Sequence, residues 1–201
     1  MSATTRWARS NRLRTVLGAG LATFAAAVCG LVTPSPAHAV PSHTWSSSTV
    51  CVESHVGPEW GVRGAIRNWN RLDGGPTFVM QDKCADYENT VTVRYLSEDN
   101  RYTGWTKWYW DATGHMVHAD VTLNPQRIAA FPGEDRSCQR KHTTTHEFGH
   151  VLGLRHYPHK HAGSVMSYLG WKDLCGSLSE HDEADYTELY AGSSLVREPA
   201  H

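Results

Sequence analysis

Residues 146–156 read His-Glu-Phe-Gly-His-Val-Leu-Gly-Leu-Arg-His, and this stretch decides the fold. On a helix, His146 and His150 lie one turn apart on the same face, so both imidazoles can point at a single metal ion. Glu147 directly follows the first histidine, which is the position of the general base in the H-E-x-x-H mechanism. The pattern therefore predicts a zinc-binding helix with a carboxylate beside the metal.

The neighbouring histidines differ in what their spacing allows. Gly153 can adopt the left-handed conformation that ends a helix, so His156 can turn back as the third ligand. Three protein ligands leave a fourth position open for water, which is typical of catalytic rather than structural zinc. His159 and His161 fit this geometry less well than His156. His142 lies one turn before the first ligand but has no glutamate beside it, and we expect it to be a solvated or capping residue.

A second motif follows the third histidine, where residues 164–168 read Ser-Val-Met-Ser-Tyr. The long histidine motif followed by a methionine turn resembles the metzincin metalloproteases, and the local sequence is most similar to matrixin-like and serralysin-like members. The end of the chain is similar to the last helix of matrix metalloproteases at Leu178-Ser179, Asp182 and Leu189-Tyr190. The resemblance is strong over residues 142–192 and schematic over residues 58–125.

The resemblance implies a zincin-like α+β fold, with a twisted, mostly parallel sheet, an antiparallel edge strand, an active-site helix and a C-terminal helix. It also implies that His146, His150 and His156 bind one catalytic zinc ion. Glu147 would take a proton from the zinc-activated water and pass it to the departing amine of the substrate. Met166 would form a hydrophobic floor beneath the zinc ligands.

Further roles concern the substrate. Tyr168 matches the position at which astacins and serralysins carry a tyrosine near zinc, where its hydroxyl would stabilise the oxyanion, whereas matrixins lack this function. An extended polypeptide would add a strand along the edge formed by residues 116–124. Residues 169–174 would line one wall of the pocket, with Trp171 either in that wall or packed under a disulfide at Cys175.

The first 39 residues predict a cleaved secretory signal. Four arginines precede an uncharged stretch, residues 16–32, and Ala37-His38-Ala39 fits the small-x-small cleavage pattern. An uncleaved membrane anchor is the alternative, but the stretch is short for a spanning helix. The expected mature chain, residues 40–201, is a single extracellular domain and a monomer, with no membrane attachment after cleavage. Without those four arginines, 19 basic residues fall to 15 against 20 acidic ones, so nothing favours nucleic acid as a partner.

Four cysteines remain in the expected mature chain: Cys51, Cys84, Cys138 and Cys175. In an exported protein they indicate two disulfides with three alternative connectivities. We favour Cys51 with Cys84 and Cys138 with Cys175, because each disulfide then cross-links one half of the domain. Zinc binding by these cysteines is the competing interpretation, but the chain has no C-x-x-C pair.

Hydrophobic patterning places the expected elements. Residues 40–50 are polar and serine-rich and predict a loosely held arm. A helix is expected over residues 58–72, and strands over 77–80, 90–96 and 116–124. Between the last two strands stand Trp105, Trp108 and Trp110, which are either a ligand platform or ordinary loop or hairpin packing.

No second metal site is indicated. His115 and His118 have no matching set of acids and histidines around them, and we expect them at the surface. No glycine-aspartate repeat supports calcium, although the resemblance is compatible with it. The space between Ala39 and the first expected helix is too short for a matrixin-type cysteine-switch propeptide, so the protein would be exported active or be restrained by its short arm or a separate inhibitor.

Three functions agree with these patterns. The leading one is a secreted zinc endopeptidase in which Glu147 is the general base. The second is a catalytically silent secreted binding module that zinc only stabilises, and the third is a zinc amidohydrolase acting on a non-protein substrate. Glu147 favours an enzyme, because a structural zinc has no need of a carboxylate beside its first ligand.

Overall fold

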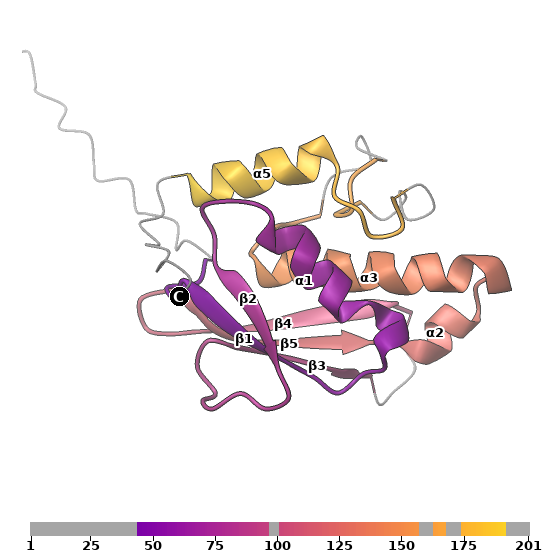
Figure 1. Cartoon of the computed structure of the whole chain (residues 1–201), viewed down its shortest axis with the longest axis horizontal. Helices are drawn as coiled ribbons and strands as arrows, with labels where there is room; N and C mark the ends of the chain where they lie inside the picture. Colours follow the sequence, from indigo (N-terminus) through magenta and orange to yellow (C-terminus); the bar gives the residue numbers. More distant parts are fainter. Residues whose placement is uncertain (1–43, 97–100, 157–162, 168–173, 192–201) are drawn as a thin grey trace, which may run out of the picture. The chain divides into compact units, whose positions relative to one another are not determined.

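The computed structural model describes residues 44–96, 101–156, 163–167 and 174–191 (Figure 1). All of these residues belong to one compact unit, Ala39–His201. The expected signal peptide and the expected roles of Tyr168, Trp171, His159 and His161 lie outside the described residues. Within the described part of the chain, no helix is both long and apolar enough to cross a bilayer.

A five-stranded mixed sheet forms the base of the fold, in the order β2-β1-β3-β5-β4. All neighbouring strands run parallel except β4, which is antiparallel to β5. The expected mostly parallel sheet with an antiparallel edge strand is therefore confirmed. Its strands are β1 (Thr49–Ser54), β2 (Thr77–Gln81), β3 (Thr90–Tyr95), β4 (Gly104–Trp110) and β5 (Met116–Leu123).

The expected identity of the edge strand is wrong. Residues 116–124 were expected at the edge, but β5 lies between β3 and β4, and β4 forms the edge. Alternation along a strand reports which face is solvated and says nothing of how many neighbours the strand has, so the pattern could not distinguish these positions. The tryptophan-rich segment is thus a strand, with Trp108 opposite Ala119 of β5.

The expected loose N-terminal arm is also wrong. Trp45 is 1% exposed, and its indole Nε1 donates a hydrogen bond to the backbone oxygen of Val151 over 2.8 Å. From Thr49 the chain continues as β1, a central strand that buries Val50 and Val52 completely. The polar, serine-rich composition of this segment gives no sign of the strand. Pairing with neighbouring strands supplies the backbone hydrogen bonds, whatever the polarity of the residues around it.

Helices cover one face of the sheet (Figure 1). The expected helix over 58–72 is confirmed in two pieces, η1 (Pro58–Trp60) and α1 (Val62–Asn70), which meet at Gly61 with φ 69°. Helix α3 (Arg136–Val151) packs against α1, and Phe148 of α3 meets Phe78 of β2 edge-to-face at 5.3 Å. The other helices among the described residues are α2 (Pro125–Ala129), η2 (Gly133–Asp135) and α5 (Glu180–Tyr190).

Indole groups from three parts of the chain hold the backbone of α3. Trp69 of α1 donates to the Thr145 oxygen over 3.0 Å, and Trp108 of β4 donates to the His150 oxygen over 2.7 Å. Trp45 provides the third bond, described above. Buried indoles pack apolar area and satisfy a polar atom at once, so they fix the helix firmly relative to the sheet.

Two disulfides are present, Cys51–Cys84 and Cys138–Cys175, and the favoured pairing is confirmed. The first joins β1 to the segment after β2. The second joins the first turn of α3 to the residues before α5. This second bridge therefore holds the segment before α5 close to the helix that carries the histidine motif.

Candidate active site

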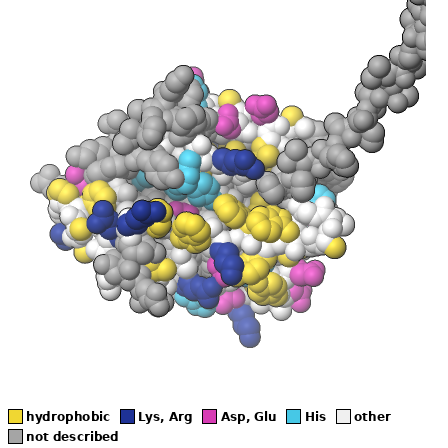
Figure 2. Space-filling view, turned by 180° about the vertical axis from the view of Figure 1, so that it is seen from behind, with side chains coloured by type: hydrophobic (Ala, Val, Ile, Leu, Met, Phe, Trp, Pro, Cys, Tyr) yellow, Lys and Arg dark blue, Asp and Glu magenta, His cyan; other side chains and the backbone are white. Residues whose placement is uncertain are grey.

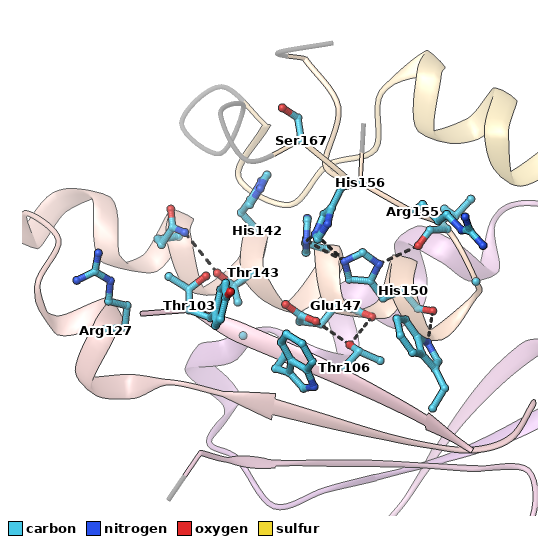
Figure 3. A pocket seen from close by; sticks show the side chains of 18 of the residues that line it. Thr103, Thr106, Arg127, His142, Thr143, Glu147, His150, Arg155, His156 and Ser167 are labelled. Carbon is cyan, nitrogen blue, oxygen red and sulfur yellow. Dashed lines mark hydrogen bonds between the residues drawn. The ribbon is translucent and has the colours of Figure 1, made fainter. Parts of the chain in front are cut away.

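Three imidazoles converge at the end of α3 (Figure 3). His146 and His150 project from one face of the helix, the chain leaves it at Gly153 with φ 94°, and His156 turns back. The Nε2 atoms lie 3.2 Å apart for His146 and His150, and His156 Nε2 lies 2.9 Å from each of them. Tetrahedral zinc with bonds of about 2.0–2.1 Å needs ligand nitrogens about 3.3 Å apart, so this cluster fits the ion closely.

Backbone oxygens orient two of the rings. His146 Nδ1 lies 2.8 Å from the Val165 oxygen, and His150 Nδ1 lies 2.8 Å from the Leu154 oxygen. A carbonyl beside Nδ1 requires the proton there, which leaves the Nε2 lone pair for a metal. The tautomer needed for zinc binding is therefore set by the fold.

Burial keeps these rings neutral. It lowers the pKa of His150 to about 4 and that of His146 well below its ordinary value, and the neighbouring His150 lowers the latter further. The pKa of His156 is also lowered by burial. Neutral imidazole is the form that binds metal, so the site is prepared for zinc at neutral pH.

Glu147 lies beside the three histidines and is only 4% exposed. Burial raises the pKa of its carboxyl to about 7, although a hydrogen bond from Thr106 acts in the opposite direction. Thr106 Oγ1 donates to Glu147 Oε2 over 2.7 Å. A carboxylate with a pKa near neutrality is suited to take up and release a proton during one turnover.

Close approach of β4 to α3 depends on Gly104. A Cβ atom at this position would lie 2.7 Å from Glu147 Oε1 and 2.8 Å from Thr143 Cγ2. Only glycine therefore lets the edge strand pass this close to the carboxylate. Neither Gly104 nor Thr106 was predicted from the sequence, where they stand unmarked in the aromatic segment.

Met166 of the methionine turn is completely buried. It touches α3 between the first two histidines, because a Cβ atom at Gly149 would lie 2.2 Å from the methionine sulfur. The methionine side chain thus packs against the helix that carries the first two histidines. Its role beneath a bound metal stays a proposal.

Asp182 of α5 holds the methionine turn in place. Its fully buried carboxylate accepts hydrogen bonds from the Val165 and Met166 backbone nitrogens over 2.9 and 3.3 Å, and from the Ser164 hydroxyl. It also caps its own helix by accepting from the Ser179 nitrogen over 2.8 Å. The sequence analysis named Asp182 only within the resemblance to the last helix of matrix metalloproteases. Its hydrogen bonds to the methionine turn were not predicted.

Two histidine expectations are wrong. His142 was expected to be solvated or capping but is only 5% exposed, and it lines the cavity beside α3, where burial lowers its pKa to about 4. His118 was expected at the surface but is 3% exposed, because the ring of Tyr87 stacks on it at 3.9 Å. In both cases a segment distant in sequence covers the side chain, which local spacing does not reveal.

A cavity of about 880 Å³ opens beside the histidines and Glu147. All three tryptophans line the cavity; Trp108 also donates a hydrogen bond to the backbone of α3, whereas Trp105 and Trp110 are 53% and 46% exposed. The face opposite to that of Figure 1 carries exposed histidine side chains with hydrophobic and basic side chains beside them (Figure 2). Packing and an exposed aromatic wall are thus both present in this strand.

Within the described ranges, one group of residues is arranged to hold a metal ion: His146, His150 and His156. The described part of the chain brings together His146, His150, His156 and Glu147, with Met166 against the same helix, whereas Tyr168 and residues 169–173 lie outside it. The histidine cluster and the sheet order agree with the metzincin resemblance.

Comparisons with known proteins give distant structural neighbours. The structure of myroilysin is 15% identical, covers 75% of this chain and 97% of its own, and has a TM-score of 0.46. High choriolytic enzyme 1, a hatching enzyme zinc-protease from the medaka fish Oryzias latipes, is 14% identical, covers 76% and 96% respectively, and has a TM-score of 0.44. No protein family and no curated protein sequence matches the chain.

Proposed function

We propose that this protein is a secreted zinc-dependent endopeptidase of the metzincin type. The observation that carries the proposal is the position of Glu147, a buried carboxylate next to three converging imidazoles at the wall of a large cavity. A zinc that only stabilises the fold needs neither an adjacent base nor access to a cavity. Hydrolysis of an amide bond needs both.

The three imidazoles would hold one zinc ion, which, when bound, supplies a Lewis acid that acidifies water and polarises the substrate carbonyl. Glu147 takes the proton of the attacking water and delivers it to the nitrogen of the broken peptide bond. The hydrogen bond from Thr106 holds the carboxylate in one orientation during both transfers. Tyr168 is proposed to stabilise the developing oxyanion, in the manner of astacins and serralysins.

An extended polypeptide fits this cavity best as a substrate. Gly104, Trp105 and Thr106 of β4 line the cavity, and β4 is the edge of the sheet. In the described structure, β4 pairs with β5 alone, so the other side of the strand is available for main-chain hydrogen bonds to a peptide. Substrate binding is therefore assigned to β4 in place of residues 116–124.

Extracellular action is part of the same proposal. Two disulfides support it, because such bridges form and persist in oxidising compartments. The sequence pattern of residues 1–39 supports export. A single zinc and a monomeric protein are proposed with it.

The test compares the zinc-loaded protein with its Glu147→Ala variant on casein, an unstructured protein. Zinc binding is measured in parallel for both proteins. We expect casein cleavage by the first only and equal zinc content in both. Cleavage by the variant would overturn the role of Glu147, and zinc binding without cleavage by either protein would favour the binding-module or amidohydrolase alternatives.

A further inference from the structure

Basic side chains surround the active-site cavity. Arg101, Arg127 and Arg155 all line it, and all three are exposed. Among the described residues that line the cavity, the acidic one is Glu147, which is buried and hydrogen-bonded to Thr106. As far as the structure describes it, the solvent-facing rim of the cavity therefore carries charge of one sign.

The arginines stand at different ends of the cavity. Arg127 belongs to α2, and Arg155 directly precedes the third histidine, and Figure 3 shows them on opposite sides of the histidine cluster. Arg101 precedes β4, where its guanidinium donates to the Tyr102 hydroxyl over 2.7 Å. Figure 2 likewise shows basic side chains on either side of the exposed histidines. A peptide that crosses the site would meet positive charge before and after the bond to be cleaved.

Two arginines of the rim are not held in ion pairs, unlike two arginines elsewhere on the described surface. Arg71 forms an ion pair with Glu183, and Arg94 forms one with Asp120 at 2.8 Å. In the same described part of the chain, neither Arg127 nor Arg155 has an acidic partner. The whole chain has a formal net charge of -1, so the basic rim is a local feature and not a consequence of composition.

Charge of one sign around a cleft with low-dielectric walls raises the local concentration of ligands of opposite charge. We infer that the cleft selects acidic polypeptide segments, with carboxylates on both sides of the cleaved bond. This inference rests on the proposed peptidase function and names its substrate class. Exposed ion pairs contribute about 0.2–1 kcal/mol each, which corresponds to about 1.4- to 5-fold in kcat/KM for each arginine engaged.

The experiment uses fluorogenic peptides that share one cleavable centre and carry Glu, Gln or Lys on both flanks. We measure kcat/KM for the zinc-loaded protein and for Arg127→Gln and Arg155→Gln. Arg63→Gln is the matched control, because Arg63 is an exposed arginine of α1 that does not line the cavity. The Glu-flanked peptide should be cleaved fastest, each rim variant should reduce that advantage about 1.4- to 5-fold, and the control should keep it.

Two further measurements separate this inference from the proposed function. The advantage of the Glu-flanked peptide should shrink as ionic strength rises to about 1 M, where charges are screened beyond about 3 Å. Binding of the same peptides to the zinc-loaded Glu147→Gln variant is measured by tryptophan fluorescence, which requires no turnover. Charge-dependent binding without cleavage by the native protein would support the acidic preference and reject the peptidase. Equal cleavage or binding of all three peptides, or an advantage that both rim variants keep in full, would overturn the acidic preference.

Discussion

Thr106 Oγ1 lies 2.7 Å from Glu147 Oε2 and 3.2 Å from the Glu147 backbone oxygen. A single hydroxyl on the edge strand thus contacts both the carboxylate and the backbone of the proposed general base. Because β4 is also the strand proposed to bind substrate, peptide binding and orientation of the base depend on the same element.

Thr106→Val removes this hydroxyl and keeps the shape of the side chain. Hydrogen bonds to charged groups contribute about 1.5–3 kcal/mol, so we expect kcat/KM to fall about tenfold or more, mainly through kcat. Steady-state kinetics on a peptide substrate measures the change. Thr122→Val is the control, since Thr122 Oγ1 donates to the Trp105 oxygen in the same strand pair, away from the base. Equal losses in both variants would show that the hydroxyl only supports the sheet.

Gly104→Ala tests the close approach of β4 to α3. The new Cβ atom would overlap Glu147 Oε1 at 2.7 Å and Thr143 Cγ2 at 2.8 Å, so either the carboxylate or the strand must move. We expect at least a tenfold loss of kcat with zinc content unchanged, because about 1.4 kcal/mol of lost transition-state stabilisation suffices. Gly133→Ala is the control, as nothing lies within 4 Å of its added Cβ. A Gly104→Ala protein with unchanged kcat would show that the position of Glu147 does not depend on this close approach.

The sequence was sufficient for the parts of the site that depend on local spacing. His146, Glu147 and His150 are fixed by the helical period, and His156 by the glycine turn before it. Thr106 acts on a residue 41 positions away, and nothing in its own neighbourhood marks it. Its role depends on the packing of β4 against α3, which is a property of the whole fold.

Strand order shows the same limit. The alternation of residues 116–124 correctly predicted a strand, yet its polar positions His118 and Asp120 are buried, and β5 is internal because the aromatic segment adds β4 outside it. Likewise, the buried state of His118 depends on Tyr87, 31 residues earlier. Periodicity along one strand carries no information on its partners.

Asp182→Ala should destabilise the methionine turn. It leaves the Val165 nitrogen and the Ser164 hydroxyl without their acceptor in a fully buried position, whereas the Met166 nitrogen keeps its hydrogen bond to Ser164 Oγ. Buried groups without a partner cost about 1–3 kcal/mol each, and we expect a total loss of about 3 kcal/mol and a Tm lower by about 6–12 °C.

Thermal unfolding of the zinc-loaded protein measures this loss. Asp185→Ala, in the same helix and only partly buried, serves as its control and should change stability by less than about 0.5 kcal/mol. If the two variants unfold together, the carboxylate of Asp182 does not support the turn.

Removal of the Cys138–Cys175 bridge by a double Cys→Ser substitution should cost about 2–4 kcal/mol, since the bridge closes a segment of 37 residues. Denaturant unfolding measures the cost. Peptide mapping without reduction should recover this pair and Cys51–Cys84. Recovery of crossed pairs would contradict the described connectivity.

Zinc titration of the metal-free protein tests the central claim most directly. Cleavage of a fluorogenic peptide should rise linearly with added zinc and stop rising at one zinc per chain. The His156→Ala variant, which lacks one of the three imidazoles, should lose this sharp end point. Full cleavage before zinc is added, or one tightly bound zinc with no cleavage of any polypeptide, would contradict a zinc peptidase built on His146, His150, His156 and Glu147.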